Sequence, residues 1–162
     1  MSIIERTYEA FQRDENTFFF ESKGWHGTFP LIARFEPKII SLKDRKISTY
    51  NFGYACIFMD ENNRYAFDDE ILIGNGDHYK IFRTVARLIR DFIYTNPSVV
   101  VYLEGSTLDR TFTYNLLISR YASQILDEVD IDILTSDFES TIPFKKDSEA
   151  DVIGFLITKR IR

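Results

Sequence analysis

The stretch Val99-Val-Val-Tyr-Leu-Glu-Gly-Ser-Thr-Leu-Asp-Arg-Thr-Phe-Thr-Tyr114 decides the predicted fold. Its continuous apolar run, Val99 to Leu103, predicts a buried strand that ends at Gly105. Ser106 and Thr107 then lead into an amphipathic segment typical of a helix. A helix that begins directly after a buried strand can present free backbone N–H groups to an anion. The stretch therefore predicts a strand, a turn and a helix, with a candidate ligand site at the turn.

The residues before this stretch predict an antiparallel β-meander. Residues 28–36 and 50–58 alternate apolar and polar side chains, which is typical of half-buried strands. An aromatic segment over residues 17–21 precedes them, and Arg64 to Ile73 returns as a further strand. One face of such a meander is rich in aromatic side chains, so we expect other elements to cover it.

A helix is predicted directly after the meander. Asp77 is a suitable N-cap, and Asn96-Pro97 ends the helical pattern. The apolar side chains between them recur at steps of one, three and four residues, and they are Ile81, Phe82, Val85, Leu88, Ile89, Phe92 and Ile93. This spacing predicts one broad apolar face that packs on the sheet.

The remaining residues predict a second helix and two further strands. Residues 108–123 have a helical pattern, residues 125–134 alternate as a half-buried strand, and Val152 to Lys159 forms the last strand. The segment from Ile142 to Ser148 is expected to be a loop. The predicted fold is therefore α+β: an antiparallel β-meander covered by two helices, with additional strands after each helix, in a two-layer single domain over residues 1–162.

Composition restricts the class of protein. The formal charge of −5 argues against a protein that binds nucleic acid over its whole surface. The single cysteine, Cys56, rules out an internal disulfide and provides no paired-cysteine metal site, and we expect neither a metal nor a cofactor. The sequence has no secretory signal and no apolar run long enough to span a membrane, which favours a cytoplasmic protein with no membrane partner.

Several motifs occur in a characteristic order and spacing, most closely over residues 74–121. They are Asn75-Gly-Asp77, Thr84-Val-Ala86, Gly105-Ser-Thr107, Arg110-Thr111, Tyr114, Ile118-Ser-Arg-Tyr121 and a last strand that ends in Lys159-Arg160. The sequence resembles, on these motifs, an uncharacterised family of small bacterial proteins that is known only as a domain of unknown function. The resemblance implies a bacterial origin and a shared fold, and it implies no activity.

The turn at Gly105 is the first candidate ligand site. Ser106 and Thr107 can add hydroxyl groups to the helix N-terminus, and Arg110 can bind a phosphate or carboxylate through two hydrogen bonds. Tyr114 lies one further turn along the same helical face. The structural alternative is that Ser106 or Thr107 caps the helix and that Arg110 pairs with an acidic side chain of the protein.

Asn75 and Asp77 form a second turn between a strand and a helix, and the two turns can lie at the same end of the fold. Together they predict a site for an anionic ligand. The carboxylate of Asp77 opposes an anion beside it, so the alternative is that Asp77 binds Arg110 and holds the two turns together. Trp25, in a glycine-flanked turn, either stacks on a partner or folds back on its own sheet.

A basic ridge on the first predicted helix is another candidate site. It consists of Lys80, Arg83, Arg87 and Arg90, at steps of three, four and three residues. These side chains either form a solvated face that keeps the protein soluble or bind phosphate backbones or an acidic partner. The acids between Asp127 and Asp151 can instead neutralise the basic ridge within the fold.

Three functions remain open. The leading hypothesis is a non-catalytic binding or interaction module for an anionic small molecule or a nucleic acid. The first alternative is a phosphate-processing enzyme, a nuclease or phosphotransferase, that uses Arg110, Tyr114 and a carboxylate such as Asp77 or Glu104. The second is a protein-partner module, such as a homodimer that pairs an aromatic-rich edge strand.

Overall fold

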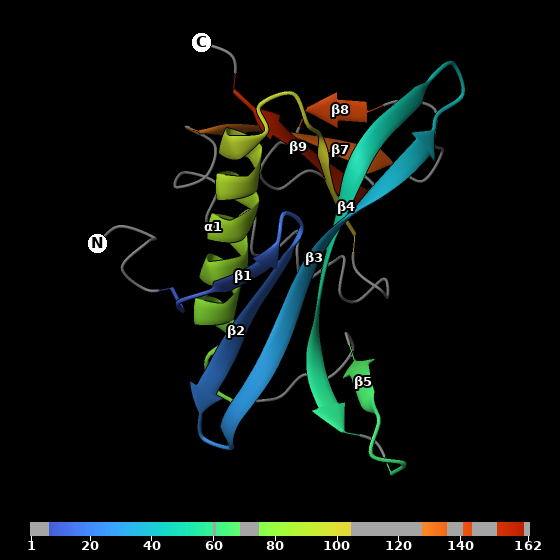
Figure 1. Cartoon of the computed structure of the whole chain (residues 1–162). Helices are drawn as coiled ribbons and strands as arrows, with labels where there is room; N and C mark the ends of the chain where they lie inside the picture. The colour runs from blue at the N-terminus through green and yellow to red at the C-terminus, as the bar shows by residue number, and fades with distance from the viewer. Residues whose placement is uncertain are drawn as a thin grey trace. The chain divides into compact units, whose positions relative to one another are not determined.

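The computed structural model describes residues 7–59, 61–68, 75–104, 128–135, 141–143 and 152–160. Its elements are β1 (Phe11–Asp14), β2 (Thr17–Gly24), β3 (Gly27–Ser41), β4 (Lys46–Met59), β5 (Tyr65–Asp68), α1 (His78–Thr95), β6 (Val101–Leu103), β7 (Val129–Thr135), β8 (Thr141–Pro143) and β9 (Val152–Lys159) (Figure 1). The chain divides into two compact units, unit 1 (Met1–Phe35 and Gly53–Leu88) and unit 2 (Glu36–Phe52 and Ile89–Arg162). Strands β3 and β4 and helix α1 contribute residues to both.

Unit 1 contains the strands of the predicted meander. β1, β2 and β3 are antiparallel neighbours, with Phe20 opposite Leu31, and β5 lies antiparallel beside the end of β4. The expected alternation is present at Leu31, Ala33 and Phe35, which are all buried. Ile32 points to the opposite face and is only 4% exposed, so β3 is covered on both faces at this point.

Helix α1 has the predicted position. The backbone N–H of Ile81 donates to the carbonyl of Asp77 at 3.0 Å, so the helix begins at the expected N-cap, and it ends directly before Asn96-Pro97. The predicted apolar face is buried at Phe82, Val85, Leu88, Ile89, Phe92 and Ile93. In unit 2, the ring of Phe92 meets the ring of Tyr50 from β4 edge to face, with centroids 5.4 Å apart.

Unit 2 contains a mixed sheet, and the sequence, which predicted an antiparallel meander followed by additional strands, did not indicate the direction of the later strands. β6 is parallel to β4, with Val101 opposite Tyr50, and antiparallel to β9. β7 lies between β9 and β8 and is antiparallel to both. A parallel pair needs a long crossover connection, and the chain supplies one between β4 and β6 that includes α1. All three residues of β6 are buried, as is usual for a strand with both faces covered.

The second half of the chain both confirms and corrects the expected elements. β9 spans Val152–Lys159 as predicted, and β7 covers most of the strand expected over residues 125–134. The loop expected at Ile142 is wrong there, because Thr141–Pro143 forms the edge strand β8, where a proline is tolerated as the last residue. The helix expected over residues 108–123 lies outside the described residues, and so does the end of the strand expected over 64–73.

The coarse prediction of an α+β protein is therefore confirmed by a sheet with helix α1, while the single domain over residues 1–162 stays a prediction. Both faces of the unit 2 sheet carry buried apolar side chains. Ile133 and Phe155 are fully buried on the first face, and Leu134, Leu156 and Tyr102 pack with Ile40 and Leu42 on the second. Within the ranges that the structure describes, no helix is long and apolar enough to cross a membrane.

Candidate functional site

Asn75 connects the turn between β2 and β3 to the start of α1 in unit 1. Its side chain is buried, and its Nδ2 donates to Ser22 Oγ and to the carbonyl of Gly27, both at 3.0 Å. Its Oδ1 accepts from the backbone N–H of His26 at 2.7 Å, and its carbonyl accepts from the N–H of Trp25 at 3.1 Å. Residues 24–27, which we call the Trp25 turn, are therefore held in one conformation by a single buried amide.

Asp77 lies beside Asn75 in the same network. Its Oδ2 accepts hydrogen bonds from the hydroxyls of Tyr8 and Ser22, both at 2.6 Å. The Tyr8 hydroxyl in turn accepts from the backbone N–H of Lys23 at 3.0 Å. Burial, followed by the hydrogen bond to Asp77, raises the pKa of Tyr8 to about 12, so the phenol stays protonated and donates to the carboxylate. The structure thus brings the two predicted residues together through Ser22.

Trp25 is the most exposed large apolar side chain of the described residues, at 84%. Its ring lies over Gly76, where φ is +80° and an added Cβ would be 3.0 Å from Cε2 of the indole. At Gly24, an added Cβ would be 1.9 Å from the carbonyl oxygen of Asn75. Glycine is therefore required at both positions, and it lets the indole lie on the backbone with its other face exposed.

The side chains of the basic ridge contact the protein itself. In unit 1, the guanidinium of Arg87 donates to Thr7 Oγ1 at 2.8 Å and to the carbonyl of Tyr8 at 2.9 Å. Lys80 Nζ lies 4.3 Å from the centre of the Tyr8 ring. Arg83 is half-buried on the same helix. These contacts tie residues 7 and 8 to α1, and binding of nucleic acid by the basic ridge stays a prediction.

In unit 2, the last member of the basic ridge meets acids. Arg90 lies 3.3 Å from Asp91 and 3.5 Å from Glu128, which belongs to the acidic stretch that we considered as an alternative partner of the basic ridge. All three side chains are partly exposed, so these pairs contribute little to stability.

The candidate residues Ser106, Thr107, Arg110 and Tyr114 lie outside the described residues, so their roles stay predictions. The strand that leads to them, β6, ends at Leu103, and Glu104, the alternative catalytic carboxylate, follows it directly. Its Oε2 accepts from the Tyr102 hydroxyl at 2.5 Å, and its Oε1 lies 3.5 Å from Lys38 Nζ. Burial, followed by the hydrogen bond to Glu104, raises the pKa of Tyr102 well above its usual range.

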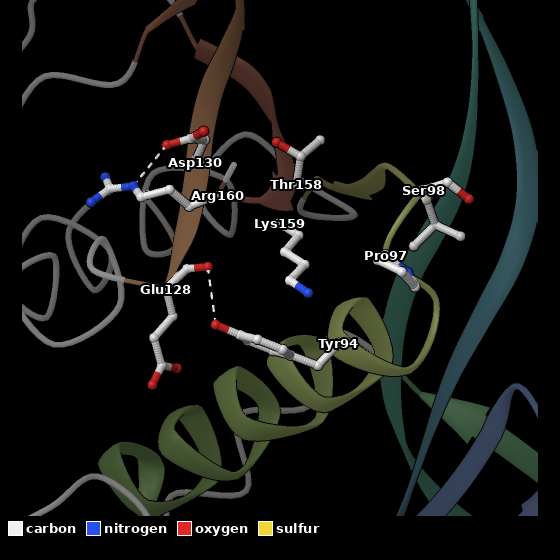
Figure 2. A pocket seen from close by; sticks show the side chains of 9 residues that line it. Tyr94, Pro97, Ser98, Glu128, Asp130, Thr158, Lys159 and Arg160 are labelled. Atoms are coloured by element: carbon white, nitrogen blue, oxygen red, sulfur yellow. Dashed lines mark hydrogen bonds and ion pairs between the residues drawn. The ribbon is translucent and has the colours of Figure 1, made fainter. Parts of the chain in front are cut away.

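An open hollow of about 890 Å³ lies at the C-terminal end of α1 in unit 2 (Figure 2). Tyr94 and residues 97–99 line one side, and residues of β7 and β9 line the other. Lys159 extends between Tyr94 and the Pro97–Ser98 turn, with Nζ 5.0 Å from the centre of the Tyr94 ring. We did not predict this hollow. The available signal was a tyrosine before the helix-ending Asn96-Pro97, together with a lysine that ends the last strand.

One family of proteins is similar to this chain over almost its whole length. The sequence model of a family of unknown function, DUF6934, matches residues 5–160. This confirms the resemblance to a domain of unknown function, while the bacterial origin stays a prediction. Neither the curated proteins nor the solved structures contain a significant match.

Proposed function

We propose that this chain, which belongs to the DUF6934 family of unknown function, is a non-catalytic binding module for an anionic ligand, single-stranded nucleic acid. The ligand would contact the Trp25 turn of unit 1. The observation that carries the proposal is the 84% exposure of Trp25 on a turn that buried Asn75 holds in place.

An exposed indole of this kind is suited to stacking. Gly76 covers one face of the Trp25 ring, and the side chain is otherwise open to solvent. Nucleobases stack on such aromatic faces without sequence preference, with about 1–3 kcal/mol per base. Because the hydrogen bonds of Asn75 already fix the turn, little conformational entropy is lost when a ligand binds.

Basic side chains near the Trp25 turn favour phosphate. Lys23 directly precedes the turn and is exposed, and its backbone N–H contacts the Tyr8 hydroxyl. Lys80 lies over the ring of the same tyrosine. The carboxylate of Asp77 opposes an anion, although its Oδ2 already accepts hydrogen bonds from the hydroxyls of Tyr8 and Ser22. The balance predicts a modest and salt-sensitive affinity.

The test uses the fluorescence of Trp25, the single tryptophan of the chain. A single-stranded oligodeoxythymidine at low salt should quench this fluorescence with saturation, because the base stacks on the indole. Lys23→Gln should weaken binding and reduce the slope of log affinity against log salt by about 0.7. The proposal is wrong if the oligonucleotide causes no saturable change at low salt.

Trp25→Ala is followed with a fluorescent oligonucleotide, because the intrinsic signal is lost. Its affinity should fall roughly 5- to 150-fold, the equivalent of stacking one base. Phe11→Ala is the matched control, since it removes another exposed aromatic side chain of unit 1, at 62% exposure, and should leave the affinity unchanged. Equal losses in the two variants would contradict a specific role for the Trp25 turn.

A homodimer is the second candidate function, and strand β1 favours it. All four residues of β1 are exposed, and β1 is the first strand of the sheet in unit 1. The exposed backbone edge of such a strand can pair with another chain. Light scattering should then give twice the monomer mass of 19.1 kDa, and Phe11→Lys should restore the monomer. A monomer at all concentrations rules out this candidate.

A further inference from the structure

We infer that the hollow at the C-terminal end of α1 in unit 2 binds a small organic anion, whose carboxylate or phosphate group contacts Lys159 and whose apolar body rests on Tyr94 and Val99. This site uses none of the residues of the Trp25 turn, so the inference does not depend on the proposed function.

The charges around the hollow leave Lys159 as the available cation. Glu128 Oε2 lies 3.5 Å from Arg90 Nη1, and Asp130 Oδ1 lies 3.1 Å from Arg160 Nε, so each acid that lines the hollow faces an arginine. Among the described residues, no carboxylate is paired with Lys159. Its ammonium group instead lies beside the aromatic ring of Tyr94.

The walls of the hollow fit a ligand with a polar end and an apolar body. The ammonium group of Lys159 provides the polar contact, and Tyr94 and Val99 provide apolar surface. Figure 2 shows Lys159 reaching into the space between these walls. The volume of about 890 Å³ is within the usual range for small-molecule sites, roughly 300–1,000 Å³.

The structural alternative is that Lys159 only stabilises the C-terminal end of α1, where backbone carbonyls carry partial negative charge. The same carbonyls weaken the attraction of an anion, so we expect a dissociation constant on the order of 1 mM. Anion binding and helix stabilisation can be distinguished by experiment, because a lysine that only stabilises the helix binds no added anion.

The experiment follows backbone amide signals by NMR while sodium benzoate or sodium phosphate replaces sodium chloride at constant ionic strength. Both probes should shift the signals of Ser98, Val99 and Lys159 with saturation, and benzoate should bind more tightly because its ring contacts the apolar wall. Shifts that do not saturate with either probe would overturn the inference. Equal affinity for the two probes would overturn the part played by the apolar body.

Variants of Lys159 separate ligand binding from helix stability. Lys159→Gln should weaken benzoate binding at least tenfold, whereas Lys159→Arg keeps the charge and should bind within a few-fold of wild type. Lys46→Gln is the matched control, because it removes an exposed lysine of unit 2 that does not line the hollow. Unchanged benzoate binding in Lys159→Gln would refute the inference. The inference would also be refuted if Lys159→Gln melts at a lower temperature while benzoate shifts no signals of the wild-type protein, because Lys159 would then have only a structural role.

Discussion

In unit 1, a buried amide and a carboxylate hold the β2–β3 turn, residue 8 and the start of α1 through hydrogen bonds. Asn75 contacts Ser22, His26 and Gly27, and Asp77 accepts from Tyr8. In unit 2, the centre of the sheet is apolar, with Ile133, Leu134 and Phe155 fully buried, and the ion pairs lie at partly exposed positions. Local order at the Trp25 turn of unit 1 thus depends on a few specific contacts, whereas the sheet of unit 2 spreads its stability over many apolar ones.

This difference has a physical consequence for mutation. A hydrogen-bond network fails when one backbone position moves, because each donor or acceptor that is left unpaired costs about 1–3 kcal/mol. In a packed apolar core, the loss depends on the apolar surface that the altered side chain buries, and each fully buried aliphatic residue contributes about 1.5–3 kcal/mol. Glycine-to-alanine variants of the two units should therefore differ in how much unfolding free energy they lose.

The largest effect is expected for Gly24→Ala in unit 1. The new Cβ would be 1.9 Å from the backbone carbonyl of Asn75, which cannot rotate away, so the Trp25 turn must open. We expect the free energy of unfolding, measured in urea, to fall by about 3 kcal/mol or more. Gly53→Ala is the matched control, because nothing lies within 4 Å of the added Cβ, and it should be close to neutral. Similar stability of the two variants would contradict the role of the Asn75 network.

Gly154→Ala is the corresponding variant of unit 2, and its effect should be smaller. The added Cβ would be 2.6 Å from Cε2 of Tyr102, which is a side chain and can shift. We expect a loss of about 1–3 kcal/mol in the free energy of unfolding. Combining it with Tyr102→Leu, which removes the ring, should recover part of that loss. Additive losses in the double variant would show that the two residues do not collide.

Patterns within a short segment could be predicted from the sequence. Helix α1 begins after Asp77 and ends before Asn96-Pro97, and β9 has the expected bounds. The apolar spacing that predicts these elements lies within each of them, and burial follows it in the structure.

Pairing between distant segments could not be predicted. The parallel contact of Tyr50 with Val101 depends on which strands become neighbours, and no local spacing encodes that choice. The contacts of the candidate site could not be predicted for the same reason. The sequence identified Asn75 and Asp77 as part of a turn, but their partners Tyr8 and Ser22 are far away in the sequence, and no motif marks them.

Tyr8→Phe should reveal the network through its dependence on pH. The pKa of Tyr8 is raised to about 12 in the folded protein by burial and by Asp77, against about 10 in the unfolded chain. A raised pKa gives a stabilising contribution that is complete below pH 10 and disappears as the pH rises from 10 to 12. At pH 7 the variant should lose about 1 kcal/mol of unfolding free energy, and this deficit should shrink between pH 10 and 12. A deficit that stays constant with pH would contradict the hydrogen bond to the carboxylate.

The smallest effect, and one of opposite sign, is expected for Asp132→Asn on β7 of unit 2. Burial, followed by repulsion from Asp130, raises the pKa of Asp132 above its usual range, and Arg45 only partly opposes this shift. The protonated carboxyl is therefore favoured in the folded protein, and the stability that it provides is lost as the pH rises above the unfolded value of about 3.9. Asp132→Asn should be slightly more stable than wild type at pH 7, by less than about 0.5 kcal/mol because the side chain is only partly buried. Thermal melts should show this gain disappearing below about pH 4, whereas Asp130→Asn, which breaks the pair with Arg160, should show no gain at pH 7. A loss of stability in Asp132→Asn at pH 7 would mean that the attraction of the carboxylate to Arg45 outweighs the cost of its burial.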